Sequence, residues 1–406
     1  MSQPSETETT PQESHSDSSQ EDRSRTIETW DQLDCKVELL RGIYSYGFEA
    51  PSPIQKKAIA PMMAKHDLIA QAQSGTGKTG CFTVGTLERI DTTKKETQAM
   101  ILSPTRELSM QTKNVLDHIG TFIPNLTTQL LVGGTSTDSD IAKLQSDKPH
   151  VVIGCPGRVH DMLRRRKLSA AQLRLIVLDE ADEMLSAGFK EQVYNIFQFL
   201  PNTIQVCLFS ATMPNELHSL TDKFMRDPVR VLVKAEQLTL EGIKQFYIAL
   251  DDDSQKYDTL KDLYASLSVS QCIIYCNSVR RVQDLYDAMT QDGFPVCQIH
   301  SSMDKDERTR TYREFKSGSQ RVLISSNLTA RGIDVQQVST VINFDVPRDV
   351  NTYLHRIGRS GRWGRKGMGI NFVTRREVRN IKDIESHYQT QIDEFPSNWE
   401  SFVAGK

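Results

Sequence analysis

A glycine-rich stretch early in the chain has the residue types needed to hold a nucleoside triphosphate. Gly75, Gly77, Lys78 and Thr79 follow a short apolar run that ends at Ala70. Glycines let backbone N–H groups curl around phosphates at the start of a helix. The lysine can reach the β- and γ-phosphates, and the threonine hydroxyl can bind Mg²⁺. The stretch therefore predicts a phosphate-binding loop, and a plain glycine-rich turn at a helix start is the alternative.

Two adjacent acids further along the chain fit the same chemistry. Asp179 and Glu180 directly follow the apolar run 175–178. One carboxylate suits Mg²⁺ coordination, directly or through water, and the other suits orienting or deprotonating an attacking water. Alone, such a pair is commonly a solvated turn or a helix cap. Following a phosphate loop in this order, it predicts an ATP·Mg²⁺ site, with Asp179 at the metal and Glu180 at the water.

An arginine-rich segment near residue 360 forms a third set. Arg356, Arg359 and Arg362 are spaced three residues apart, which places them on one face if the segment is helical. A planar guanidinium can meet the charge that spreads over the γ-phosphate oxygens in the transition state of phosphoryl transfer. The same spacing fits binding of an RNA backbone, or a basic surface helix, so these residues leave the alternatives open.

Short apolar runs alternate with longer helical stretches and would position these residues. Continuous apolar runs with helices between them indicate parallel sheets covered on both faces. One series comprises 68–70, 99–102, 151–153, 175–178 and 206–209, and a second comprises 272–275, 296–299, 322–324 and 341–344. A polar stretch separates the two series. The sequence therefore predicts two α/β domains in tandem, with a tail at 1–26, the first domain at 27–233, a linker at 234–242 and the second domain at 243–406.

The bulk composition narrows the class of protein. A chain of 406 residues suits two domains, and it contains no run of roughly 18 apolar residues that could span a membrane, nor an apolar signal core. Its seven cysteines are scattered and form no CxxC pair, which argues against a zinc site or a disulfide framework and favours free thiols. A net charge of −3 does not indicate a nucleic-acid binder, but a near-neutral protein can still bind RNA in a basic groove. The Ser/Thr-rich, acidic first 26 residues lack the apolar content to fold.

Together these motifs resemble those of the DEAD-box family of RNA helicases, in order, over about residues 27–398. The matching stretches are Gly47-Phe48 with Pro53-Ile54-Gln55, Pro104-Thr105-Arg106-Glu107-Leu108, Gly133-Gly134, Pro156-Gly157-Arg158, Asp179-Glu180-Ala181-Asp182, Ser210-Ala211-Thr212, Arg331-Gly332-Ile333-Asp334 and the arginine motif that starts at His355. The resemblance implies two RecA-like domains, each a parallel sheet with helices on both faces, joined by a short linker. It also implies an RNA-stimulated ATPase that binds single-stranded RNA through its backbone and locally unwinds short duplexes.

The resemblance assigns a role to each motif. ATP contacts are expected from Trp30, Phe48, Gln55, Ser74, Gly75, Thr76, Gly77, Lys78, Thr79, Gly332, Asp334, Arg359 and Arg362. Catalysis is expected from Lys78, Asp179, Glu180, Arg359 and Arg362, with Mg²⁺ held by Thr79 and Asp179. Coupling of ATP to RNA is expected from Asp182, Ser210, Thr212 and His355. RNA contacts are expected from Pro104, Thr105, Arg106, Gly133, Gly134, Pro156, Gly157, Arg158, Asn277, Arg308 and Ser326.

Several stretches, including 39–48, 240–246 and 332–338, resemble the branch of the family that acts in translation initiation. That branch implies a translation initiation scaffold protein as partner, a chain that is monomeric alone, and a cytoplasmic location. Branches of the exon-junction and ribosome-biogenesis type share part of this sequence, so an ATP-gated RNA clamp, with a nuclear location, is the alternative. Cys155, Lys305 and Asn327 stand where the family usually has Thr, Gln and Asp. All three belong to RNA or interdomain motifs, so we expect them to affect coupling more than hydrolysis.

Replacing Arg362 with Gln tests the predicted arginine finger. Because the finger reaches the γ-phosphate only when the domains close, its loss should act on the transition state. RNA-stimulated kcat should fall at least about a hundredfold, while the affinity for ADP stays within a few-fold. If added RNA restores turnover in a variant of normal thermal stability, Arg362 binds RNA instead.

Overall fold

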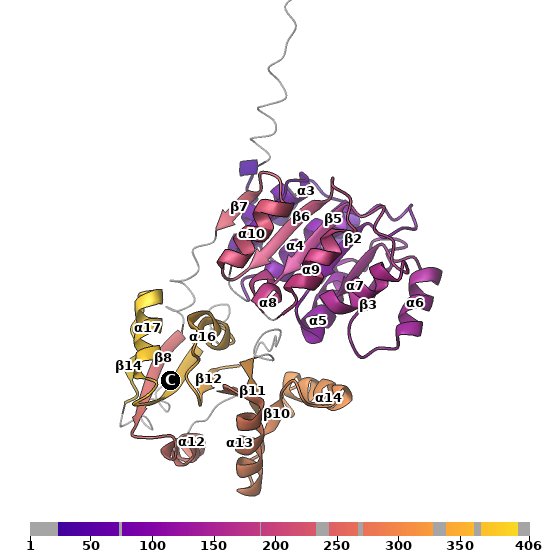
Figure 1. The fold of residues 1–406 in the computed structure, drawn as a ribbon. Helices are drawn as coiled ribbons and strands as arrows, with labels where there is room; N and C mark the ends of the chain where they lie inside the picture. The colour runs from indigo at the N-terminus through magenta and orange to yellow at the C-terminus, as the bar shows by residue number, and fades with distance from the viewer. Residues whose placement is uncertain are drawn as a thin grey trace, which may run out of the picture.

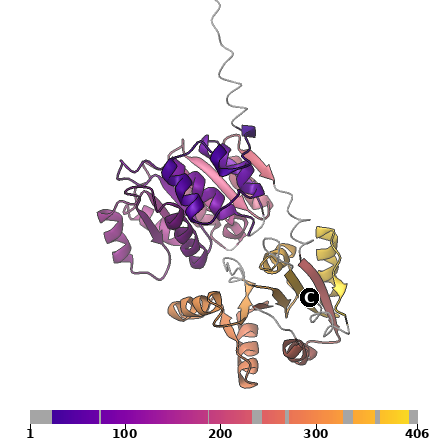
Figure 2. The same ribbon diagram turned by 180° about the vertical axis from the view of Figure 1, so that it is seen from behind.

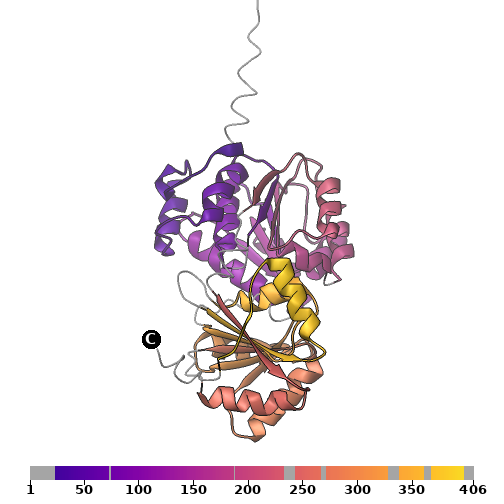
Figure 3. The same cartoon turned by 90° about the vertical axis from the view of Figure 1, so that its left-hand side faces the viewer.

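The computed structural model describes residues 23–72, 75–186, 188–232, 243–266, 271–327, 338–360 and 367–396. These ranges form two α/β domains, one stacked on the other (Figure 1, Figure 3). Each domain contains a seven-stranded sheet in which all neighbouring strands run parallel. The predicted fold class is confirmed, since the helices cover both faces of each sheet.

The first sheet has the strand order β3-β4-β2-β5-β6-β1-β7. Its strands are β1 (Leu68–Gln71), β2 (Ala99–Leu102), β3 (Thr128–Leu131), β4 (Val151–Gly154), β5 (Leu175–Asp179), β6 (Gln205–Ser210) and β7 (Val229–Leu232). The helices are the 3-10 helix η1 (Trp30–Gln32), α2 (Val37–Ser45), α3 (Pro53–Met63), α4 (Lys78–Arg89), α5 (Arg106–Ile119), α6 (Thr137–Ser146), α7 (Pro156–Arg164), α8 (Ala181–Ser186), α9 (Lys190–Phe197) and α10 (Asn215–Phe224). The sequence did not reveal β3 and β7, which lie at the two edges and are only partly buried.

Two apolar cores lie on opposite faces of the first sheet. Leu68 and Ala70 of β1 pack with α2 to α5, whereas Ile69 between them packs with α7 to α10. Figure 1 shows α8, α9 and α10 in front of the sheet, and the view from behind in Figure 2 shows the indigo and purple helices over its other face. Strands buried on both sides explain why β1 reads as a continuous apolar run.

The second sheet has the strand order β10-β11-β9-β12-β13-β8-β14. Its strands are β8 (Ile243–Leu250), β9 (Cys272–Cys276), β10 (Cys297–Ile299), β11 (Val322–Ser326), β12 (Thr340–Asn343), β13 (Gly367–Thr374) and β14 (Asp393–Glu394). The described helices are α12 (Gln255–Ser266), α13 (Val279–Gln291), α14 (Lys305–Lys316), α16 (Val350–Ile357) and α17 (Val378–Tyr388). The sequence missed β8, β13 and β14, because polar residues interrupt their apolar pattern.

Two further sequence expectations concern the whole chain. In the described part of the chain, no helix is both long and apolar enough to cross a membrane. All seven cysteines are free, and five of them are buried, which confirms the prediction of unpaired thiols. The tail at 1–26 lies mostly outside the described residues, and so does the linker at 234–242.

A close helix contact supports the loop that leads to the phosphate site. At Gly42 in α2, an added Cβ would lie 1.8 Å from the carbonyl oxygen of Ile119 at the end of α5. Only glycine fits this approach, because the nearest atoms are all backbone atoms of Ile119 and cannot move aside as a flexible side chain could. Helix α2 is followed by Gly47, whose φ of +91° turns the chain toward Phe48. The contact between α2 and α5 therefore anchors the segment that carries Phe48.

Gly42→Ala should destabilise the first domain, since the new methyl group must push α2 away from α5. We expect a loss of about 1–3 kcal/mol in the free energy of unfolding, measured by urea denaturation. Ser45→Ala, at an exposed position of the same helix, is the matched control and should change stability by less than about 0.5 kcal/mol. Equal stability of the two variants would contradict the close packing.

Candidate active site

The glycine-rich loop lies where the sequence predicted it, between β1 and α4. Gly77 caps α4 with a φ of +99°, a left-handed conformation that favours glycine. A Cβ there would lie 2.6 Å from Oγ of Ser52 and 2.9 Å from Nε2 of Gln55. The loop therefore packs directly on the start of α3, and the N–H groups at the N-terminus of α4 are suited to binding an anion.

Gln55 sits in a capping box at the start of α3. Its Oε1 accepts from the backbone N–H of Ser52 at 2.7 Å, and its Nε2 donates to the carbonyl oxygen of Gly77 at 3.1 Å. An amide has two acceptor sites and two donor hydrogens, so each end keeps one free for an adenine edge. The two bonds fix the orientation of the amide.

The two aromatic residues expected at the base differ in exposure. Trp30 is fully buried and stacks on Phe48 with ring centroids 6.1 Å apart. Phe48 is half-buried and lies close to Gly80 of α4. Phe48 is therefore available to a nucleobase, and Trp30 supports its ring from inside the domain.

Buried opposite charges surround the expected γ-phosphate. Nζ of Lys78 lies 3.1 Å from Oε1 of Glu180, and both side chains are less than 10 % exposed. Burial acts to raise the pKa of Glu180, but the Lys78 ammonium, together with smaller contributions from His355 and Arg359, holds that pKa below its usual value. Burial and the neighbouring Glu180 charge raise the pKa of Asp179 to about 7. Glu180 also has a φ of +47°, a strained value for a non-glycine residue of the kind that occurs at functional sites.

The donor set fits a Mg²⁺ ion bound together with phosphates. The described residues contain no group of three or more His, Cys, Asp or Glu side chains that could hold a metal alone. Mg²⁺ in nucleotide sites commonly uses one or two protein ligands and completes its shell with phosphate oxygens and water. Burial and Glu180 raise the pKa of Asp179 more than Lys78 lowers it, and Oε2 of Glu180 is buried without a hydrogen-bond partner among the described residues. A bound cation would lower the pKa of Asp179 and would give Oε2 of Glu180 a partner.

The four expected coupling residues come together. Oγ1 of Thr212 donates to Oδ2 of Asp182 at 2.7 Å, and the backbone N–H of Asp182 donates to Oγ of Ser210 at 3.3 Å. Nε2 of His355, from α16 of the second domain, lies 3.4 Å from the same Oδ2 of Asp182. Figure 1 shows α16 on the side of the second domain that faces α8. Asp182 thus joins the strand end at β6 to the second domain.

Arg356 and Arg359 do not share one helical face, because the segment is not helical throughout. Helix α16 ends at Ile357, and Gly358 forms its C-cap. Arg359 is 4 % exposed, and its positive charge helps to lower the pKa of Glu180. Arg356 is fully buried inside the second domain and donates hydrogen bonds to residues of that domain. Arg359 faces the nucleotide site, whereas Arg356 holds the second domain together.

The expected RNA residues lie at the carboxyl ends of parallel strands. Pro104 to Arg106 follow β2, Gly133 and Gly134 follow β3, and Pro156 to Arg158 follow β4. In the second domain, Asn277 follows β9 and Ser326 ends β11. The carboxyl ends of parallel strands meet at one edge of a sheet, so these segments form one surface in each domain.

Sequence reasoning missed two acids that position the arginines of this surface. Arg308 of α14 forms an ion pair with Glu107, which connects the two domains. Arg158 is held by Asp140 and by the carbonyl oxygen of Thr135, 2.9 Å from its Nη2. Glu107 belongs to the recognised motif at 104–108, so a role for it at the RNA surface could have been predicted. Asp140 gives no sequence signal, since it is one of two aspartates in α6 and belongs to no recognised motif.

Cys155 takes the N-cap position of α7, and its Sγ lies 3.6 Å from Oγ of Ser109. Burial raises the pKa of the Cys155 thiol to about 11. The thiol is therefore neutral at physiological pH. Four expected site residues, Ser74, Gly332, Asp334 and Arg362, lie outside the described residues.

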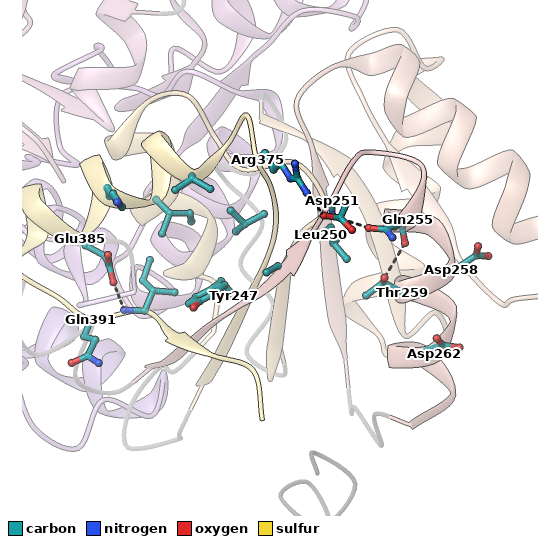
Figure 4. A pocket seen from close by; sticks show the side chains of 16 residues that line it. Tyr247, Leu250, Asp251, Gln255, Asp258, Thr259, Asp262, Arg375, Glu385 and Gln391 are labelled. Carbon is teal, nitrogen blue, oxygen red and sulfur yellow. Dashed lines mark hydrogen bonds and ion pairs between the residues drawn. The ribbon is translucent and has the colours of Figure 1, made fainter. Parts of the chain in front are cut away.

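A separate hollow of about 990 Å³ lies in the second domain between β8, α12 and α17. Figure 4 shows Arg375 bonded to Asp251 at its rim, with Tyr247 on the strand side and Glu385 on α17. None of the expected ATP or RNA residues lines it. Its size does not make it the active site, because the phosphate loop and the acids at the end of β5 lie in the other domain.

Comparisons with known proteins agree with this geometry. Residues 52–220 match a family model described as DEAD/DEAH box helicase, and residues 255–364 match one described as helicase conserved C-terminal domain. The chain is 55% identical over 373 residues to the ATP-dependent RNA helicase eIF4A of Pyricularia oryzae, covering 92% of this chain and 94% of that protein. It is 53% identical to the eIF4A of Schizosaccharomyces pombe, with 92% and 94% covered.

Solved structures give the same result. Dbp5 of Saccharomyces cerevisiae bound to RNA and ADP-BeF3 is similar, with a TM-score of 0.86 and 33% identity, over 93% of this chain and 99% of that one. A point variant of Dbp5 bound to the same ligands gives a TM-score of 0.85. The similarity extends over both domains.

The raised pKa of Asp179 predicts a specific pH dependence of stability. A raised carboxyl pKa stabilises the fold fully below the ordinary value of 3.8 and loses this contribution as the pH rises through about 7. Without nucleotide, the native chain should therefore lose stability relative to Asp179→Asn between about pH 4 and 7, by up to about 1.4 kcal/mol per pH unit. Urea unfolding across this range measures the difference. Asp138→Asn, at an exposed position of α6, should show none, and a flat difference for Asp179→Asn would rule out the raised pKa.

Proposed function

The chain belongs to the DEAD-box helicase family and is an ATP-dependent RNA helicase, and we propose that it unwinds short mRNA duplexes in translation initiation. Binding to one RNA strand would be independent of sequence, through phosphates and 2′-hydroxyls. The relatives named eIF4A, which match along nearly their whole length, support the initiation role. The same role supports a cytoplasmic location and a translation initiation scaffold protein as partner.

The observation that carries this mechanism is the contact of His355 and Asp182 between the domains. Asp182 also bonds to Thr212 and to Ser210, at the end of β6. A shift of the second domain relative to the first changes the position of Asp182, and with it the segment after β6. ATP-driven closure would thereby be linked to the grip on RNA.

Residues of both domains would share the work of hydrolysis. Lys78 and the N-terminus of α4 would bind the phosphates, and Thr79 and Asp179 would hold Mg²⁺, which neutralises charge on the phosphates. Glu180 would orient or deprotonate the attacking water. Arg359 would supply positive charge from the second domain once the domains close, so that turnover depends on closure and closure depends on RNA.

Closure would also separate the strands of a duplex. Both domains present strand-end segments that would grip one RNA strand, including Gly133 and Gly134 in the first domain and Asn277 in the second. A strand bent to fit both surfaces cannot stay in a regular A-form duplex. Local separation of a few base pairs follows, and release of phosphate would reopen the cleft.

Replacing Ser210 and Thr212 together with Ala tests the coupling. The change removes both bonds to Asp182 but leaves Lys78, Asp179 and Glu180 in place. We expect substantial RNA-stimulated ATPase activity, while the number of base pairs unwound per ATP falls several-fold. The matched control is Ser219→Ala with Thr203→Ala, two exposed positions of the same domain. Unchanged unwinding per ATP would refute the coupling role.

The rival function is an ATP-gated RNA clamp that serves assembly. RNA-stimulated turnover by the isolated chain supports the helicase, whereas a stable ATP-state RNA complex that forms only with partner proteins supports the clamp. A pull-down from cell lysate separates the branches by asking whether cap-binding initiation scaffolds or splicing proteins co-purify.

A further inference from the structure

The last turn of α7 presents four consecutive cations on the surface of the first domain. All four side chains are exposed, and they belong to Arg164, Arg165, Arg166 and Lys167. Nη2 of Arg164 lies 3.0 Å from Oδ1 of Asp161, and Nε of Arg165 lies 2.9 Å from the same carboxylate. Among the described residues, Arg166 and Lys167 form no ion pair and no side-chain hydrogen bond. Four cations and one carboxylate leave a net charge of 4 − 1 = +3 in this turn.

A fixed turn holds the last two of these cations at the surface. The backbone N–H of Arg166 donates to the carbonyl oxygen of Leu163 at 2.9 Å, and the N–H of Lys167 donates to that of Met162 at 2.9 Å. Arg166 has a φ of 56°, the left-handed conformation that glycine favours at the end of a helix. Glycine would suit this turn better than arginine does. The backbone geometry therefore does not account for a cation at this position.

An exposed aromatic ring lies beside the cations. Phe199, in the turn that follows α9, is 43 % exposed. The centre of its ring lies 6.2 Å from the centre of the His160 ring in α7. Arg164 follows His160 by four residues, so both side chains lie on the same face of α7. Phe199, His160 and Arg164 therefore form one surface on the two helices, which pack against each other (Figure 1).

The segments that build this surface contain few acids. Residues 162–178 include five cations and no Asp or Glu, and residues 192–215 include no charged residue. We call the surface formed by His160, Phe199 and 164–167 the α7 strip. Single-stranded nucleic acid offers what such a strip can bind, since its phosphates pair with cations and its bases stack on an aromatic ring.

We propose that the α7 strip is a second RNA-binding site, which holds the single strand beyond the strand-end surface. The inference rests on the proposed sequence-independent binding of one RNA strand and extends its path. Helix α7 starts at Pro156, in a segment expected to contact RNA, and runs back toward the amino ends of the strands. Its 9 residues span about 13 Å, or about four nucleotides at about 3.4 Å each. The strip therefore lies outside the strand-end surface but within reach of the same strand.

RNA fits the α7 strip better than an acidic protein segment does. Carboxylates of such a segment would also pair with the cations, but the segment would have to bind in a separate event. An RNA strand already bound at 156–158 is present at a high effective concentration next to the strip. The exposed ring of Phe199 adds a stacking surface that every base can use.

RNA length tests the proposal. The measurement is the affinity for a short fluorescent oligouridylate and for one about eight nucleotides longer, twice the number that the path along α7 needs. Both are measured over a range of salt concentrations with a non-hydrolysable ATP analogue. Arg166→Gln with Lys167→Gln removes two phosphate contacts, so the slope of log K against log salt should become less steep by about 1.4 for the long RNA. Affinity for the short RNA should change by less than about twofold, because charges more than about 10 Å away are screened.

Loss of the ring tests the stacking contact separately. Phe199→Ala should weaken binding of the long RNA about fivefold or more and leave its salt slope unchanged. The short RNA should bind Phe199→Ala as it binds the wild-type chain.

Two control variants separate the strip from net charge and from folding. Lys316→Gln with Lys382→Gln removes two exposed cations from α14 and α17 of the second domain and should leave the binding of both RNAs unchanged. Arg166→Gly should melt at no lower temperature than the wild-type chain, because glycine suits the left-handed turn. The same variant should still reduce the slope for the long RNA by about 0.7. Equal effects on the short and the long RNA, or none on the long RNA, would overturn the proposal.

The wild-type chain separates this inference from the function itself. If it binds neither RNA in the ATP state, the proposed RNA binding fails. If it binds both RNAs and the variants of the α7 strip leave both affinities unchanged, only the second site fails.

Discussion

The negative charge buried at the end of β5 is the constraint on which the rest of the site depends. Asp179, Glu180, Asp182 and Glu183 are each no more than 6 % exposed. Carboxylates so close together in a dry site repel one another, and cations around them offset part of the cost. Lys78 supplies one from within the domain, and Arg359 brings another across the interface, where His355 also lies 3.4 Å from Asp182. The first domain alone is therefore electrostatically incomplete, and its excess negative charge favours the binding of a cation and the approach of the second domain.

The second domain shows the opposite arrangement. Its organising group is a buried cation, Arg356, which joins the ends of β9, β11 and β12 to α16. The helix so fixed carries His355 on its interface side. Neutral amides stabilise the cation where carboxylates would have cancelled it. The first domain thus has a cluster of buried carboxylates near the interface, and the second domain is organised around a buried cation.

The sequence predicted the features that depend on local pattern. Strands buried on both faces read as continuous apolar runs, and the two series of runs correctly indicated two parallel sheets. The edge strands β3 and β7 were missed because they are only partly buried, so their sequences mix polar and apolar residues. In the arginine motif, spacing alone could not reveal where the helix ends, and α16 ends at Ile357, before Arg359. The inward position of Trp30 likewise depends on packing between distant segments, which no short pattern records.

The all-parallel sheets divide the surface of each domain into two regions with different freedoms. All strands of a sheet place their carboxyl ends at the same edge, and many of the residues expected to act on ATP, RNA or the other domain follow these ends. None of the expected ATP or RNA residues lines the hollow beside α12 and α17. Over evolutionary time such regions can gain binding sites for regulators, change charge or accept insertions while the ATP and RNA sites stay unchanged. A single helicase core of this kind can therefore be recruited to different assemblies by altering only its far side.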